Sequence, residues 1–169
     1  EVRLWVDADH NAIHVTMVSQ QPRTVTAAAD LWRTEPTPYP LAEVSDLLED
    51  RSKPNRLHEE VIVQADQVVQ GLDESVMWYH QNLDSDVPAR IAKMQGLDEY
   101  LDQQPDPLAG RIFGATVLGW SGKGRPAKST SATALETAIG THHHFAIGIS
   151  AGRHGNSQSL MESAIGNIW

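Results

Sequence analysis

The stretch VRLWVDADHNAIHVTMV, residues 2–18, decides the fold class of this chain. Apolar and polar side chains alternate in both of its halves, and a period of two residues is typical of β-strands. The apolar positions are Val2, Leu4, Val6, Ile13, Val15 and Met17. The polar segment ADHNA separates the two runs and is typical of a turn. The stretch therefore predicts an antiparallel hairpin, with the side chains of Ile13, Val15 and Met17 pointing inward.

The strand pattern recurs along the rest of the chain. We expect further strands at residues 24–33, 60–64, 75–82, 111–120, 130–139 and 142–150, the last two paired as a hairpin. The segment SQQPR, residues 19–23, is expected to connect the first hairpin to the third strand. The prolines of TEPTPYPL, residues 34–41, are expected to end the sheet, because proline lacks the N–H that a strand ladder requires.

Helical patterns are confined to the connections and the end of the chain. Residues 42–50 are compatible with a helical turn, and residues 87–104 have helical spacing, with Pro88 in a first turn and Gly96 as an interruption. A short terminal helix is expected after Ser157 or Ser159, either of which is a suitable N-cap. Since strands dominate without a β-α-β rhythm, the sequence predicts a mainly β protein. We expect an antiparallel β-sandwich, complete or partial, in one domain spanning residues 1–169 that is part of a longer chain.

Composition excludes several classes of function. The chain has 22 acidic and 13 basic residues, a net charge of −9, which argues against nucleic acid or an anionic membrane as its main partner. It contains no cysteine, so disulfides and thiolate metal sites are excluded. Five tryptophans are an excess in 169 residues, and tryptophan is a common anchor for ligands because of its large amphipathic ring.

The polar loop EDRSKPNRLHEE, residues 49–60, is one candidate for ligand binding. Arg51, Asn55 and His58 offer planar hydrogen-bonding groups that suit the hydroxyls of a sugar. The alternative is a structural loop held by its own ion pairs.

The segment WYHQN, residues 78–82, is a second candidate. On a strand, Trp78, His80 and Asn82 share one face, where an aromatic ring beside two polar groups makes a platform for a sugar. The alternative is a tryptophan packed under a sheet edge, with a histidine that bonds a carbonyl. Trp120 and Trp32 are further candidates for an exposed platform.

The run HHH, residues 142–144, suggests a metal site. His142 and His144 would share a strand face, and His14, His80 or His154 would have to supply a third ligand. The alternative is a set of imidazoles on an exposed strand, and we predict neither a metal nor another cofactor. Carboxylate pairs are abundant, but neighbours in sequence do not make a catalytic pair, so no catalytic residue is assigned.

Three segments carry a resemblance to a known group of proteins: residues 46–66, residues 78–82 and QGLDEYLDQQPDPLAGRIFGATVLG, residues 95–119. They resemble the N-terminal β-rich domain of uncharacterised bacterial glycoside-hydrolase-like proteins. In those proteins a β-sandwich precedes an (α/α)6 barrel like that of α-L-fucosidase and maltose-phosphorylase relatives. The resemblance implies a secreted or periplasmic carbohydrate-processing protein whose catalytic carboxylates lie in the helical barrel.

The first functional hypothesis is therefore a non-catalytic sandwich that supports or borders the cleft of a separate catalytic barrel. Its partners would be carbohydrate and that helical domain of the same parent chain. A free-standing carbohydrate-binding module is the alternative, and a histidine-based metal-dependent hydrolase is the second alternative.

Overall fold

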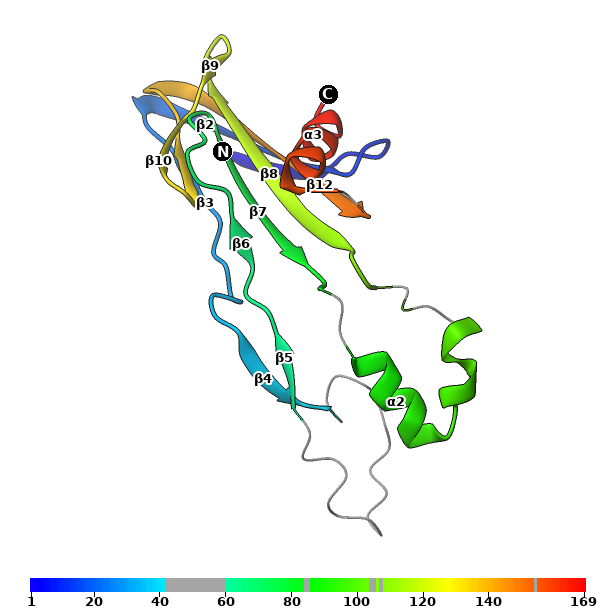
Figure 1. Cartoon of the computed structure of the whole chain (residues 1–169). Coiled ribbons are helices and arrows are strands. Elements are labelled where there is room, and N and C mark those ends of the chain that lie inside the picture. The colour runs from blue at the N-terminus through cyan, green and yellow to red at the C-terminus, as the bar shows by residue number, and fades with distance from the viewer. Residues whose placement is uncertain (42–59, 84–85, 104–105, 107, 154) are drawn as a thin grey trace. The chain divides into compact units, whose positions relative to one another are not determined.

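The computed structural model describes residues 1–41, 60–83, 86–103, 106, 108–153 and 155–169 (Figure 1). The chain divides into two compact units. The first comprises residues 1–32, 66–80 and 112–169, and the second comprises residues 33–65 and 81–111. The predicted helical turn at residues 42–50 and the loop residues Arg51, Asn55 and His58 lie outside the described residues.

A seven-stranded sheet forms the body of the first unit. Its strands, in spatial order, are β1 (Val2–Val6), β2 (Ala12–Arg23), β12 (Gly140–Gly152), β8 (Ile112–Ser121), β7 (Ser75–Gln81) and β6 (Gln67–Val68), and β9 (Arg125–Pro126) pairs with β8. Strands β1 and β2 are antiparallel neighbours, as the alternation of residues 2–18 predicts. The fold is mainly β with antiparallel sheets, which confirms the predicted fold class.

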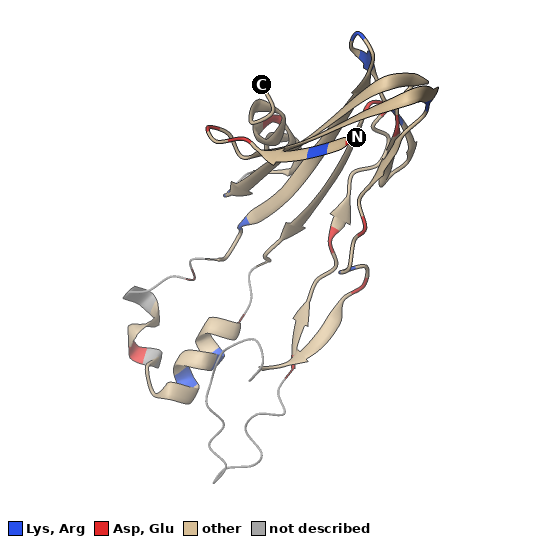
Figure 2. Ribbon diagram, turned by 180° about the vertical axis from the view of Figure 1, so that it is seen from behind, with Lys and Arg blue, Asp and Glu red and all other residues tan. Residues whose placement is uncertain are grey.

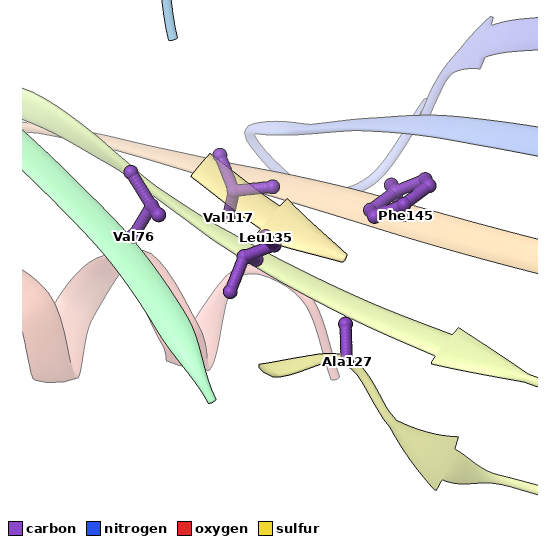
Figure 3. Close-up of a cluster of buried hydrophobic side chains, with 5 residues drawn as sticks. All are labelled: Val76, Val117, Ala127, Leu135 and Phe145. Atoms are coloured by element: carbon purple, nitrogen blue, oxygen red, sulfur yellow. The ribbon is translucent and has the colours of Figure 1, made fainter. Parts of the chain in front are cut away.

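A small sheet covers one face of this large sheet. It contains β10 (Lys128–Ser131), β11 (Ala134–Glu136) and β3 (Thr26–Ala28). The buried residues between the two layers are Val76, Val117, Ala127, Leu135 and Phe145 (Figure 3). Half-buried Val25, Ala27 and Ala29, which alternate along the predicted third strand, pack against them.

Helix α3 (Ser157–Gly166) covers part of the opposite face of the large sheet. Its buried Leu160 packs with Met77 and Ile112. A Cβ on Gly148 would lie 1.9 Å from the carbonyl oxygen of Ala164, so only glycine allows the helix this close to β12. Because both faces of the sheet are covered, Ala12 and His14 on the predicted outer face of β2 are buried as well.

The described part of the second unit includes a ribbon and the helical segments α2 (Val87–Gln95) and η1 (Asp98–Gln103), a 3-10 helix. Strands β4 (Thr37–Pro40) and β5 (Glu60–Val63) of the ribbon pair antiparallel. Pro88 stands in the first turn of α2, as predicted. Gly96, the predicted interruption, ends α2 with a left-handed φ of 73°, and η1 follows it. None of the helices in the described part of the chain is long and apolar enough to cross a membrane.

Four details of the sequence prediction are wrong. Residues 142–150 pair with β2 and β8 rather than with residues 130–139, which form their own hairpin. A central position satisfies the backbone hydrogen bonds on both edges of the long β12. Residues 19–23, expected to be a connection, instead extend β2 past an irregularity in register. Residues 34–41 contain a strand that was not predicted: Pro38 and Pro40 lie within β4, where a two-stranded ribbon leaves an edge open to residues without an N–H. The cap of α3 is Asn156, whose Oδ1 accepts the Ser159 N–H at 2.9 Å.

Candidate functional site

A row of aromatic rings crosses the large sheet on the face that α3 partly covers. The register pairs Trp5 with His14 across β1 and β2, and His144 with Trp120 across β12 and β8. Paired residues share a face, so the alternation of each strand brings these four rings together. The ring centroids are 5.2 Å apart for Trp5 and His14, 5.3 Å for His14 and His144, and 5.5 Å for His144 and Trp120. Trp169 adds an edge-on contact to Trp120 at 5.4 Å.

The two histidines of this row form a hydrogen bond. Nδ1 of His14 lies 3.1 Å from Nε2 of His144, and one ring must donate while the other accepts, so at least one of them is neutral. Burial lowers the pKa of His144, and the nearby charge of His14 lowers it further. On its other side, Nε2 of His14 is 3.9 Å from Oδ2 of Asp7. The arrangement therefore favours a neutral imidazole at His144.

A cavity of about 580 Å³ opens beside this row. It is lined by His14, Thr16, Met17, Val18, Trp120, Gly122, Gly124, His142, His143, His144, Ile168 and Trp169. This described lining contains no carboxylate, lysine or arginine, and the long strands of the large sheet carry few charges (Figure 2). The volume is typical of small-molecule sites, and the lining suits an uncharged ligand with apolar faces and hydroxyl groups.

The structure divides the predicted site residues among different places. Trp120 lines the cavity, whereas Trp78 packs against the core between the two sheets. His80 is buried and bonds Oδ1 of Asp66 at 3.0 Å through Nδ1. Asn82 belongs to the second unit, where its backbone bonds those of Gly110 and Arg111.

The metal hypothesis placed His142 and His144 on one face, and the register agrees. Nε2 of His144, however, lies within hydrogen-bonding distance of His14. Among the described residues, no group of three or more histidines and carboxylates is arranged to hold a metal ion.

Two residues of the row, Trp5 and Trp169, were not singled out by the sequence as site residues. A signal for Trp5 exists: in the hairpin of residues 2–18, Trp5 and His14 both occupy the face opposite the aliphatic one. Their pairing requires the register of the hairpin, which the sequence pattern alone leaves undetermined.

The comparisons with known proteins identify a family and no relative of known activity. A family model described as "Domain of unknown function (DUF5703)" matches residues 1–146. No curated protein and no solved structure gives a significant match. The matched range includes all four residues of the row, Trp5, His14, Trp120 and His144, although Trp169 lies beyond it.

Proposed function

The chain belongs to the family of the domain of unknown function DUF5703, and we propose that its β-sandwich is a non-catalytic, saccharide-binding part of a carbohydrate-processing protein. The observation that carries the proposal is the cavity of about 580 Å³ whose wall combines Trp120 and Trp169 with the imidazoles of His14 and His144.

Each part of this wall suits one part of a sugar ring. The faces of tryptophan side chains accept the apolar C–H groups of a pyranose, and their large area makes them effective anchors. Ring nitrogens of neutral histidine and the hydroxyl of Thr16 can donate to or accept from sugar hydroxyls. Desolvating these few uncharged groups costs less than desolvating ions, which favours an uncharged ligand.

The non-catalytic part of the proposal rests on the same lining. Hydrolysis of a glycosidic bond ordinarily requires two carboxyl groups facing each other across the sugar, about 5 to 10 Å apart. The described wall of this cavity has none. The acid and base then come from a separate helical domain of the parent protein, as the family resemblance implies.

Binding to an array of immobilised oligosaccharides tests the proposal. We expect the wild-type chain to bind at least one glycan and Trp120→Ala to weaken that binding about tenfold or more, since loss of a stacked ring removes at least about 1.4 kcal/mol. Trp32→Ala is the matched control, because Trp32 is 79% exposed and is absent from the cavity wall.

Two outcomes contradict the proposal. One is a wild-type chain that binds no glycan, or that loses binding equally with both substitutions. The other is turnover of nitrophenyl glycosides by the isolated chain, which would remove the non-catalytic assignment.

A further inference from the structure

Strand β1 forms one end of the large sheet, and its outer backbone groups face away from β2. Glu1 and Val18 exchange both of their backbone hydrogen bonds, at 2.8 and 2.9 Å, and the N–H of Asp7 donates to Ala12 at 2.9 Å. In an antiparallel ladder such pairs alternate, so Arg3 and Trp5 also turn their backbone groups toward β2. The N–H and C=O groups of Val2, Leu4 and Val6 therefore point outward.

The side chains of the same three residues form an exposed aliphatic stripe. Val2, Leu4 and Val6 are 63%, 67% and 67% exposed and lie on the face that the small sheet covers elsewhere. Outward backbone groups beside exposed aliphatic side chains are what an added strand requires. The five residues of β1 thus offer both the hydrogen bonds and the apolar contacts for another β-strand.

We propose that β1 pairs antiparallel with β1 of a second copy of this chain, about a twofold axis at Trp5. The outward backbone groups of one strand can bond those of the other only if the twofold axis passes through a residue rather than between two residues. The charges of the facing side chains then determine which residue lies on the axis. An axis at Arg3 brings two arginines together, and an axis at Leu4 places Glu1 opposite Asp7 of the second copy. An axis nearer either end of β1 pairs too little of the strand.

The axis at Trp5 gives complementary contacts between the two β1 strands. Arg3, which bonds Glu1 of its own chain at 2.6 Å, faces the partner's Asp7 in both halves, and opposite charges on facing strand positions are stabilising. Leu4 faces the partner's Val6, which covers the aliphatic stripe. Trp5 faces the partner's Trp5 in a pair without intervening hydrogen bonds, the position where side chains of neighbouring strands approach most closely.

The interface also joins the two aromatic rows. The ring of Trp5 stacks on His14 at 5.2 Å and remains 42% exposed. Across the axis, its partner ring continues the row into the second molecule. The dimer therefore presents two cavities on one continuous sheet face, an arrangement that allows bivalent binding to a repeating ligand.

Disulfide trapping tests the register. Because the chain contains no cysteine, Trp5→Cys introduces the only thiol. Facing Cα atoms in such a pair are about 4.5 Å apart, within the range of a disulfide. Arg3→Cys is the matched control, since its two copies would be separated by roughly 14 Å along the strands. Under mild oxidation we expect a covalent dimer with Trp5→Cys and monomer with Arg3→Cys.

Sedimentation velocity tests the association itself. We expect reversible dimers of the wild-type chain at roughly 100 µM protein, since a small interface binds weakly. Arg3→Glu should weaken dimerisation about tenfold or more, because it places a negative charge opposite the partner's Asp7. Arg23→Glu makes the same change of charge at an exposed residue of β2 away from the axis, and it should leave dimerisation unchanged. Leu4→Pro removes an outward N–H without breaking a hydrogen bond to β2. It should abolish dimers, while the monomer keeps a cooperative thermal unfolding transition.

Three results would overturn the proposal: a wild-type chain that stays monomeric, equal crosslinking of the two cysteine variants, or equal effects of the two arginine substitutions. A monomeric chain would leave the edge of β1 to a strand of a different partner.

Discussion

Two groups of tryptophan and histidine in the first unit have similar chemistry and different surroundings. One is the row of Trp5, His14, His144 and Trp120, which borders an open cavity. The other is the pair Trp78 and His80 on β7, two residues apart in the WYHQN segment. Trp78 packs into the core beneath the small sheet, and His80 is buried against Phe113 and Asp66.

The layer that covers an aromatic ring, rather than the residue type, determines the role of that ring. A layer that covers Trp78 makes the ring a core side chain. On the opposite face of the large sheet, α3 covers the region around Gly148. The rings of His14, His144 and Trp120 lie outside this region and line the cavity. The partner of each histidine differs accordingly: a carboxylate for His80 and a second imidazole for His14.

The largest effect should come from loosening the layer that covers Trp78. Leu135→Ala removes a fully buried side chain from the cluster with Val76 and Phe145, and we expect it to lower the free energy of unfolding by about 3 kcal/mol. Urea unfolding followed by circular dichroism measures the loss. Leu83→Ala is the matched control because Leu83 is 58% exposed, and a similar cost at both positions would contradict the buried role of Leu135.

Breaking the pair of Asp66 and His80 should have the next largest effect. An ionised carboxylate only accepts, so Nδ1 of His80 carries the proton, and Asp66→Ala leaves that buried N–H without this acceptor. We expect a loss of about 2 kcal/mol in the free energy of unfolding. The exposed Asp9→Ala should change stability far less; a wild-type melting temperature in Asp66→Ala would show that the pair is unimportant.

The smallest effect should be the pH dependence contributed by His144. Burial and the charge of His14 lower the pKa of His144 in the folded state, below its ordinary value of 6.5 in the unfolded chain. The unfolded state therefore binds more protons, and the free energy of unfolding rises with pH. This contribution is present above about pH 6.5 and is lost as the pH falls through the folded-state pKa.

The His144→Gln variant isolates this contribution, because glutamine keeps hydrogen-bonding groups and does not titrate. Between pH 7.5 and pH 5.5 we expect the wild-type chain to lose more stability than His144→Gln, as measured by urea midpoints at each pH. Parallel pH profiles for the two proteins would contradict the assignment.

Much of the fold could be predicted from local pattern. The strands at residues 60–63, 75–81 and 112–121, and the helix that begins near Pro88 and ends at Gly96, follow from alternation, proline and glycine positions. Partner choice could not be predicted in the same way. Residues 142–150 alternate as well as any edge strand, and only the assembled sheet places them between β2 and β8.

The sequence predicted the types of residue in the candidate site, but it did not predict which particular residues form it. The excess of tryptophan and the HHH run both contribute, through Trp120 and His144. Trp78 and His80 have the same local pattern on β7, yet Trp78 is a half-buried side chain packed against the core and His80 is buried. A period of two residues assigns a side chain to one of two faces, and it contains no information about which face a second layer will cover.

The β-strand character of this protein follows from the sequence, because the alternation of polar and apolar residues is a local property of the chain. That Trp5 from β1, His14 from β2, His144 from β12 and Trp120 from β8 meet in one row follows from the three-dimensional packing. The strand register brings these four residues together although they are far apart in the sequence, and α3 leaves their part of the sheet face uncovered. Both the register and the position of α3 depend on packing between distant segments.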